Sequence, residues 1–205
     1  MTEILNTVSN GGGTGTPLLI AHGLFGTARN WGVLAKRLAD GRQVIAVDMR
    51  NHGGSFRAAS NTYSDMAGDL ARVIESSGGK VDVLGHSMGG KAAMTLALSR
   101  PELLAGLIVA DIAPVAHSHS HLNYIEAMQA VDLARVTRRS DADPTLAEAI
   151  PEPMLRSFLL QNLVVEEGRA SWRINLAALA ANMAPLLDFP ADLPEAAFDG
   201  PAFFL

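Results

Sequence analysis

Four short apolar runs, separated by longer amphipathic segments, constrain the fold of this chain more than any other feature. They occupy residues 17–23, 42–50, 81–85 and 103–114, and are rich in valine, isoleucine and leucine. An apolar run of this length that ends at a turn is typical of a buried strand. We therefore expect four strands in the interior of the protein.

The segments between these runs are predicted helices. In residues 27–40 and 62–79 the apolar side chains recur at helical spacing, and residues 87–100 form a third candidate that ends before Pro101. Strands and helices therefore alternate along the chain, which predicts a parallel sheet with right-handed crossovers and helices on both faces. In such folds the ligand binds at the carboxyl ends of the strands.

The alternating pattern stops after Pro114. We find no convincing buried strand in residues 117–194, where helices or helix fragments are predicted at residues 121–136, 145–164 and 171–187. A helical insertion at this point would form a lid over the carboxyl ends of the strands.

The expected organisation therefore has three parts, and the last returns to the pattern of a strand. They are a core over residues 1–116, a lid over residues 117–194 and the beginning of a further core strand over residues 195–205.

Composition excludes several classes of protein. The 205 residues carry a net charge of −5, which argues against a nucleic-acid partner. The absence of cysteine excludes disulfides, thiolate zinc sites and a cysteine nucleophile. The N-terminus has no signal-peptide pattern, and the longest apolar stretches are too short to span a bilayer. We therefore expect a soluble cytoplasmic protein without a membrane span.

Residues 85–89, Gly-His-Ser-Met-Gly, match the pattern G-x-S-x-G between a predicted strand and a predicted helix. This context is that of a nucleophile elbow, in which flanking glycines allow a sharp turn that exposes the serine. Ser87 is thus the candidate nucleophile, and the Met88 N–H is a candidate donor to an oxyanion. The alternative is a serine that only caps a helix.

A second oxyanion donor is expected from residues 22–26, His-Gly-Leu-Phe-Gly, which follow the first strand at its carboxyl end. A glycine there allows the backbone to approach a substrate closely, and the N–H of Leu24 is our candidate. The alternative is an ordinary glycine-rich turn. Asp111 ends the fourth strand, one strand away from Ser87, and Asp48 is expected to brace the loop after the second strand.

Together, residues 22–26, 47–55, 85–90, 111–115 and 171–175 resemble the α/β-hydrolase superfamily, and most closely the small bacterial YbfF-type acyl esterases. This resemblance implies an α/β-hydrolase fold and hydrolysis of short-chain acyl esters through an acyl-enzyme. It also implies that Asp111 is the catalytic acid, whereas in most other members of the superfamily the acid follows the next strand.

The catalytic base is harder to identify. Of the six histidines, three belong to the predicted loops and elbow, namely His22, His52 and His86. The others, His117, His119 and His121, alternate with serine at the start of the lid. They could bind metal or reach Ser87, but we favour a solvated loop, and we expect neither a metal nor another cofactor.

The resemblance implies that the base lies after the last strand of the fold. We therefore expect it beyond Leu205, so that this chain is a truncated hydrolase lacking the final core elements and nearly inactive by itself. Other hypotheses remain open: a non-catalytic protein that binds a small apolar ligand, a C–C hydrolase, or a haloperoxidase-like protein. The sequence does not indicate a protein partner or an oligomeric state.

Overall fold

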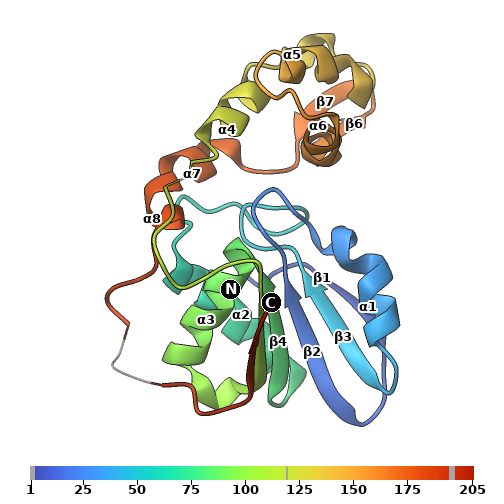
Figure 1. The fold of residues 1–205 in the computed structure, drawn as a ribbon. Helices are drawn as coiled ribbons and strands as arrows, with labels where there is room; N and C mark the ends of the chain where they lie inside the picture. Colours follow the sequence, from blue (N-terminus) through green and yellow to red (C-terminus); the bar gives the residue numbers. More distant parts are fainter. Residues whose placement is uncertain (1–2, 119, 194–196) are drawn as a thin grey trace.

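A twisted central sheet forms the base of the molecule in the computed structural model, which describes residues 3–118, 120–193 and 197–205 (Figure 1). Within these residues the sheet has six strands in the order β1-β3-β2-β4-β5-β8. Their bounds are Thr7–Gly11 (β1), Gly15–Ala21 (β2), Arg42–Val47 (β3), Val81–His86 (β4), Leu104–Ala110 (β5) and Ala202–Phe204 (β8). The predicted parallel sheet is confirmed for β2, β3, β4, β5 and β8.

Strand β1 is the exception, because it runs antiparallel to β3 and the sequence pattern does not predict it. Its side chains are mostly exposed, so they lack the apolar run that identifies the inner strands.

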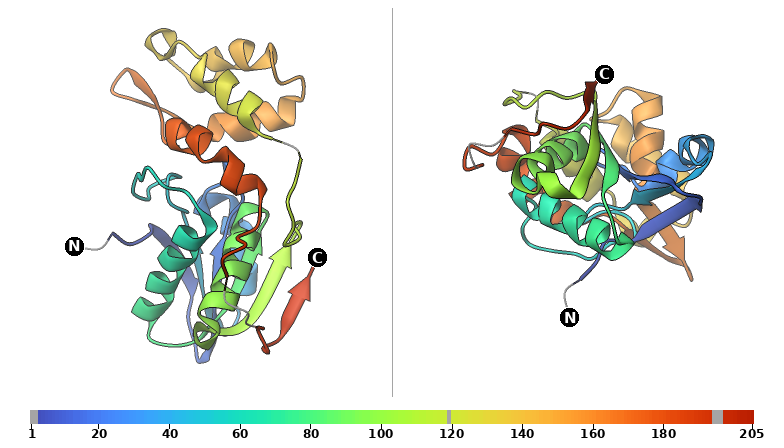
Figure 2. Two further views of the ribbon diagram at one scale, coloured as in Figure 1. Left: turned by 90° about the vertical axis from the view of Figure 1, so that its left-hand side faces the viewer. Right: turned by 90° about the horizontal axis from the view of Figure 1, so that it is seen from below.

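Helices cover both faces of the sheet, as predicted. Helices α2 (Tyr63–Ser77) and α3 (Met88–Ser99) pack on one face, and α1 (Gly32–Leu38) on the other (Figure 2). Alternate residues of each inner strand therefore enter different cores: Leu19 joins the larger one beneath α2 and α3, whereas Leu18 joins the smaller one beneath α1. This arrangement is the predicted mostly parallel sheet with helices on both faces.

A lid lies over the carboxyl ends of the strands (Figure 1). It comprises α4 (Leu122–Gln129), α5 (Asp143–Ala147), α6 (Pro153–Leu159), β6 (Leu163–Glu166), β7 (Arg169–Trp172), α7 (Leu176–Ala181) and α8 (Met183–Leu187). Short 3₁₀ turns join several of these elements, among them the turn Leu160–Asn162. No helix of the described residues is long and apolar enough to cross a membrane.

The expectation of a lid without strands is wrong. Strands β6 and β7 pair antiparallel, and Glu167 and Gly168 connect them with φ values of 52° and 74°. Two such residues form a tight hairpin turn. The hairpin replaces only the adjoining ends of the helical segments expected over residues 145–164 and 171–187, which otherwise form short helices.

Side-chain amides join the lid to the core. Asn51, in the loop after β3, accepts a hydrogen bond from the Asn175 side chain at 2.9 Å. The same asparagine accepts the Asn175 backbone N–H through its carbonyl at 2.9 Å. A second asparagine, Asn182, donates to the Ala59 carbonyl at 2.8 Å. These bonds fix the lid directly above the loops at the strand ends.

Candidate active site

Ser87 lies at the sharp turn between β4 and α3, as predicted. Its φ and ψ are 50° and −117°, an uncommon conformation for any residue with a side chain. Such a conformation costs about 1–3 kcal/mol and persists only where the surrounding structure holds it. The Ser87 N–H contributes by donating to the Ala110 carbonyl of β5 at 3.0 Å.

The flanking glycines are required by close packing of backbone, as the sequence predicts. A Cβ atom at Gly89 would lie 2.3 Å from the Ala21 carbonyl oxygen, and one at Gly85 would lie 2.3 Å from the Gly89 carbonyl oxygen. Helix α3 therefore approaches the end of β2 more closely than any other residue type would allow.

The loop formed by residues 22–26 packs directly against this elbow. A Cβ atom at Gly23 would lie 3.2 Å from the Ser87 Cβ atom, so the two backbones are adjacent. The Gly26 N–H donates to the Gly23 carbonyl at 3.0 Å, which closes a tight turn around Leu24 and Phe25. Leu24 thus lies beside Ser87.

The two candidate oxyanion donors come from different elements. Met88 is the first residue of α3, where an N–H has no acceptor within the helix. No hydrogen bond within the described residues engages the Leu24 N–H. Both amides are therefore available to a ligand beside Ser87.

Two buried histidines, His22 and His52, hold the loop of residues 22–26 against the core. The Nε2 atom of His52 accepts the Phe25 N–H at 3.2 Å, and that of His22 accepts the Met49 N–H at 2.9 Å. In both rings Nδ1 faces a backbone carbonyl, at 2.8 and 2.9 Å, so Nδ1 carries the proton. The two rings meet edge to face, 5.1 Å apart.

Burial keeps both rings neutral. It lowers the pKa of His22 to about 4 and that of His52 to about 3, mainly because a charged ring would lose its hydration. An imidazolium has no lone pair for an N–H donor, so protonation would break the bonds that hold the loop. Both histidines are therefore structural supports.

Asp48 braces the same region, which confirms its predicted role. Its carboxylate accepts the Ala28 N–H at 2.7 Å and the Gly54 N–H at 2.8 Å. It also accepts the Asn6 side chain at 2.8 Å. The carboxylate therefore ties the loop after β3 to the start of the turn that precedes α1.

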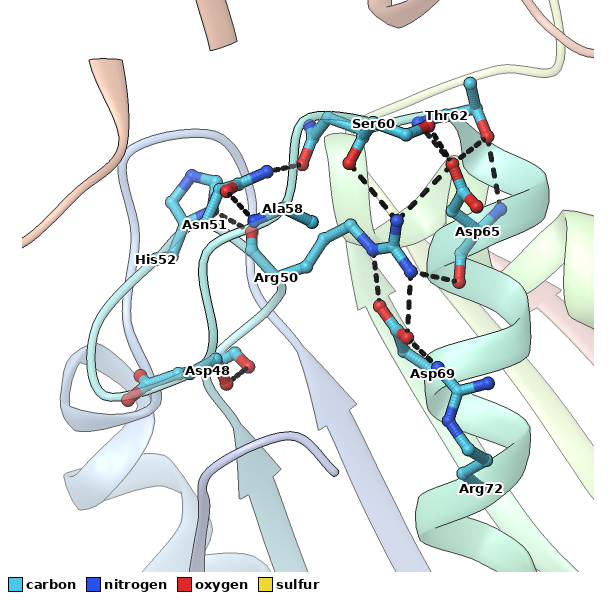
Figure 3. Close-up of polar contacts among 12 residues, drawn as sticks. Asp48, Arg50, Asn51, His52, Ala58, Ser60, Thr62, Asp65, Asp69 and Arg72 are labelled. Carbon is cyan, nitrogen blue, oxygen red and sulfur yellow. Dashed lines mark hydrogen bonds and ion pairs between the residues drawn. The ribbon is translucent and has the colours of Figure 1, made fainter. Parts of the chain in front are cut away.

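Arg50 anchors this loop to α2 (Figure 3). Its guanidinium binds the buried Asp69 carboxylate through two bonds of 2.6 and 2.9 Å, and it donates to the carbonyls of Ser60 and Asp65. The paired geometry fixes the direction of the loop as well as its position.

Asp111 follows β5 at the same edge of the sheet. Strand β5 is the neighbour of β4, so Asp111 and Ser87 lie at the ends of adjacent strands, as predicted. Its side chain is 88% exposed, and one carboxylate oxygen lies 3.8 Å from the Nε2 atom of His86. The carboxylate is thus accessible beside the elbow.

Two cavities meet at Ser87, and both are also lined by Leu24 and His121. The first has a volume of about 550 Å³ and mixes polar and apolar side chains: Tyr63, Lys91, Asp111, His117, Met183 and Leu186. The second, of about 500 Å³, is mainly apolar: Phe25, Trp31, Leu34, Tyr124, Leu155 and Phe158. A ligand at Ser87 can extend in two chemically different directions.

The histidines at the start of the lid lie partly at this site. His117 and His121 line the first cavity, whereas His119 lies outside the described residues. In the part of the chain that the structure describes, no hydrogen bond joins the Ser87 hydroxyl to a histidine.

Lys91 is a site residue that sequence reasoning did not identify. It is 1% exposed, and its ammonium donates to the carbonyls of Leu187 and Asp188 at 3.1 and 2.7 Å. Burial lowers its pKa. The available signal was a lysine four residues after Ser87 in an otherwise apolar helix.

Comparison with known proteins agrees with this geometry. The α/β hydrolase fold family matches residues 16–187. The sn-1-specific diacylglycerol lipase ABHD11 of Danio rerio is 41% identical over 208 residues, covering 97% of this chain and 65% of that protein. The chain thus spans somewhat less than two thirds of the length of this relative.

Two further matches are esterases. Esterase YbfF of Escherichia coli is 35% identical, covering 93% of this chain and 73% of that protein. A solved marine microorganism esterase is 34% identical with a TM-score of 0.93, covering 99% of this chain and 80% of that one. The resemblance to YbfF-type esterases is therefore confirmed, and the chain belongs to the α/β-hydrolase fold family.

Proposed function

We propose that the site around Ser87 hydrolyses carboxylic esters with a short acyl chain, through an acyl-enzyme. The observation that carries this proposal is the strained elbow, at which Ser87 directly precedes α3 and lies against the loop of residues 22–26. The Ser87 oxygen attacks the ester carbonyl carbon, and the N–H groups of Leu24 and Met88 stabilise the resulting oxyanion. Collapse of the tetrahedral intermediate breaks the bond to the alcohol oxygen, and the alcohol leaves with the proton taken from the Ser87 hydroxyl. Water then attacks the acyl-enzyme and releases the acid from Ser87.

A base must accept the hydroxyl proton, and we assign that role to a histidine outside these 205 residues. Asp111 would accept the N–H of that histidine and fix its tautomer. The exposed Asp111 carboxylate supports this assignment, because a catalytic acid is ordinarily covered by its histidine. The chain alone would then turn over slowly, with the oxyanion donors but no base.

We assign the two halves of the substrate from the position proposed for the histidine beside Asp111. In the tetrahedral intermediate the leaving oxygen faces the histidine, and the acyl chain points away from it. Asp111 lines only the cavity of about 550 Å³, so that cavity takes the alcohol. The acyl chain enters the apolar cavity beside Trp31 and Leu34, which favours an uncharged chain.

The test uses a form of the protein that extends past Leu205 to the length of its relatives. Hydrolysis of p-nitrophenyl esters of increasing acyl length should be lost in Ser87→Ala and retained in Ser76→Ala, a control on α2. A diacylglycerol belongs in the panel because the zebrafish relative is named for it. Undiminished turnover by Ser87→Ala would overturn the proposal.

The lid histidines provide a second check. Alanine at His117, His119 or His121 should not abolish turnover of the extended form, because none of them acts as the base. Robust turnover by the 205-residue chain, abolished by one of these three substitutions, would instead identify that histidine as the base.

A further inference from the structure

Phe25 is held in an unusual conformation from both sides. Its φ is 65°, in the left-handed region that a bulky side chain disfavours. From the core, His52 accepts its N–H at 3.2 Å. From the lid, the side-chain amide of Asn162 donates to its carbonyl at 2.9 Å. The residue next to the candidate donor Leu24 is therefore clamped between two separate parts of the fold.

Asn162 is itself fixed in place. It ends the 3₁₀ turn Leu160–Asn162 and is 1% exposed. Its carbonyl accepts the Arg173 N–H at 2.8 Å, which ties it to the end of the β6–β7 hairpin. Its side-chain Nδ2 also donates to the Leu159 carbonyl at 3.3 Å.

The orientation of this amide indicates what it does. Both groups around Nδ2 are carbonyls, so the NH₂ end must face Phe25. No described residue donates to the buried Oδ1 atom. A buried amide oxygen without a donor is destabilising. The side chain therefore binds the Phe25 carbonyl through Nδ2 while its own Oδ1 atom stays without a hydrogen bond.

We propose that Asn162 is a positioning residue through which the closed lid completes the oxyanion hole. While it binds the Phe25 carbonyl, the turn of residues 23–26 keeps the Leu24 N–H beside Ser87. Without this bond the buried carbonyl has no donor, and the peptide rotates out of its strained conformation. The Leu24 N–H then moves away from the oxyanion. The inference rests on the proposed function, in which Leu24 is a donor.

Hydrogen exchange tests the conformational part on the 205-residue chain. Asn162→Ala and Asn162→Asp, which keeps the volume but removes the donor, should accelerate exchange of the Phe25 and Gly26 amides at least tenfold. Asn182→Ala is the matched control, because it removes a different lid–core bond at Ala59. The control should leave exchange at Phe25 unchanged.

Kinetics of the extended form test the catalytic part. Both Asn162 variants should lower kcat by about tenfold or more, with KM within twofold, because an oxyanion contact acts in the transition state. Affinity for an alkylboronic acid, which forms a tetrahedral adduct with serine, should fall in parallel. Gln129→Ala, at an exposed residue that ends α4, should behave as wild type.

The outcomes separate this inference from the proposed function. If Ser87→Ala abolishes turnover but Asn162→Asp retains both kcat and slow exchange at Phe25, only the inference fails. A rise in KM with unchanged kcat would also overturn it, since that pattern indicates ground-state binding. If Ser87→Ala remains active, the proposed function fails whatever Asn162 does.

Discussion

At the scale of single residues, support of the site depends on two neutral rings. His22 and His52 each accept a backbone N–H through Nε2, and this acceptor exists only in the unprotonated form. Their folded pKa values, about 4 and about 3, lie below the ordinary value of 6.5. The unfolded chain therefore binds more protons than the folded one at intermediate acidity.

We predict that stability falls as pH decreases from about 6.5 towards 4 and 3. The contribution of each histidine is fully present above pH 6.5, and its complete loss below the folded pKa amounts to about 3 kcal/mol for His22 and about 5 kcal/mol for His52. Urea unfolding at pH 7, 5.5 and 4.5 measures the loss. His52→Asn should be less stable at pH 7 and show a shallower dependence on pH; an identical slope would contradict the assignment.

A second prediction at this scale concerns Asp111. In the extended form, Asp111→Asn should lower kcat by about 10³- to 10⁴-fold, because the partner of the histidine N–H sets its tautomer. The fold should be unchanged, since the side chain is exposed. Asp132→Asn, in the lid, is the control. A nearly silent Asp111→Asn would place the acid elsewhere, as in the commoner arrangement of the superfamily.

At the scale of elements, the elbow depends on contact between α3 and β2. Gly89→Ala should reduce stability by about 1–3 kcal/mol and abolish turnover, because its Cβ atom would meet the Ala21 carbonyl oxygen at 2.3 Å. Gly12→Ala is the matched control, since a Cβ atom there meets nothing within 4 Å. Thermal unfolding of both variants tests this, and equal melting temperatures would contradict it.

The elements that the sequence predicts well are those with a long, regular pattern. Strand β4, the elbow and α3 follow from residues 81–100, because an apolar run, G-x-S-x-G and Pro101 mark each boundary. The β6–β7 hairpin escapes prediction because its strands have only four residues each. Its clearest signal is Gly168, which permits the turn.

Contacts between distant loops are the part of the site that the sequence cannot give. Leu24 and Ser87 are identifiable because each follows a strand at a known edge of the sheet. The roles of Asn162 and Lys91 follow only from the folded structure. There, Asn162 donates to the Phe25 carbonyl and Lys91 donates to the Leu187 carbonyl. Local pattern carries no information about such pairs, because they depend on how the lid docks.

At the scale of the whole molecule, β8 is an exposed apolar edge strand. Phe203, Phe204 and Leu205 are 59%, 54% and 71% exposed. Unpaired apolar edges promote association between chains. We predict that the 205-residue chain self-associates at micromolar concentration and that Phe204→Lys reduces this in sedimentation velocity. Met154→Lys, at an exposed residue of the lid, should not reduce self-association. Equal effects of the two substitutions would contradict a role for β8.

The bonds between lid and core have a consequence for how the protein responds to the salt concentration of its solution. Among the described residues, every ion pair joins two groups within the core or two within the lid, and none crosses between them. The crossing bonds join neutral amides to carbonyls, or a cationic side chain to a carbonyl, as in Arg57 with Trp172 and Lys91 with Leu187. None of these bonds joins two opposite charges, so dissolved ions screen them little. Ionic strength should therefore not open the lid, so access to Ser87 stays the same in dilute buffer and in molar sodium chloride.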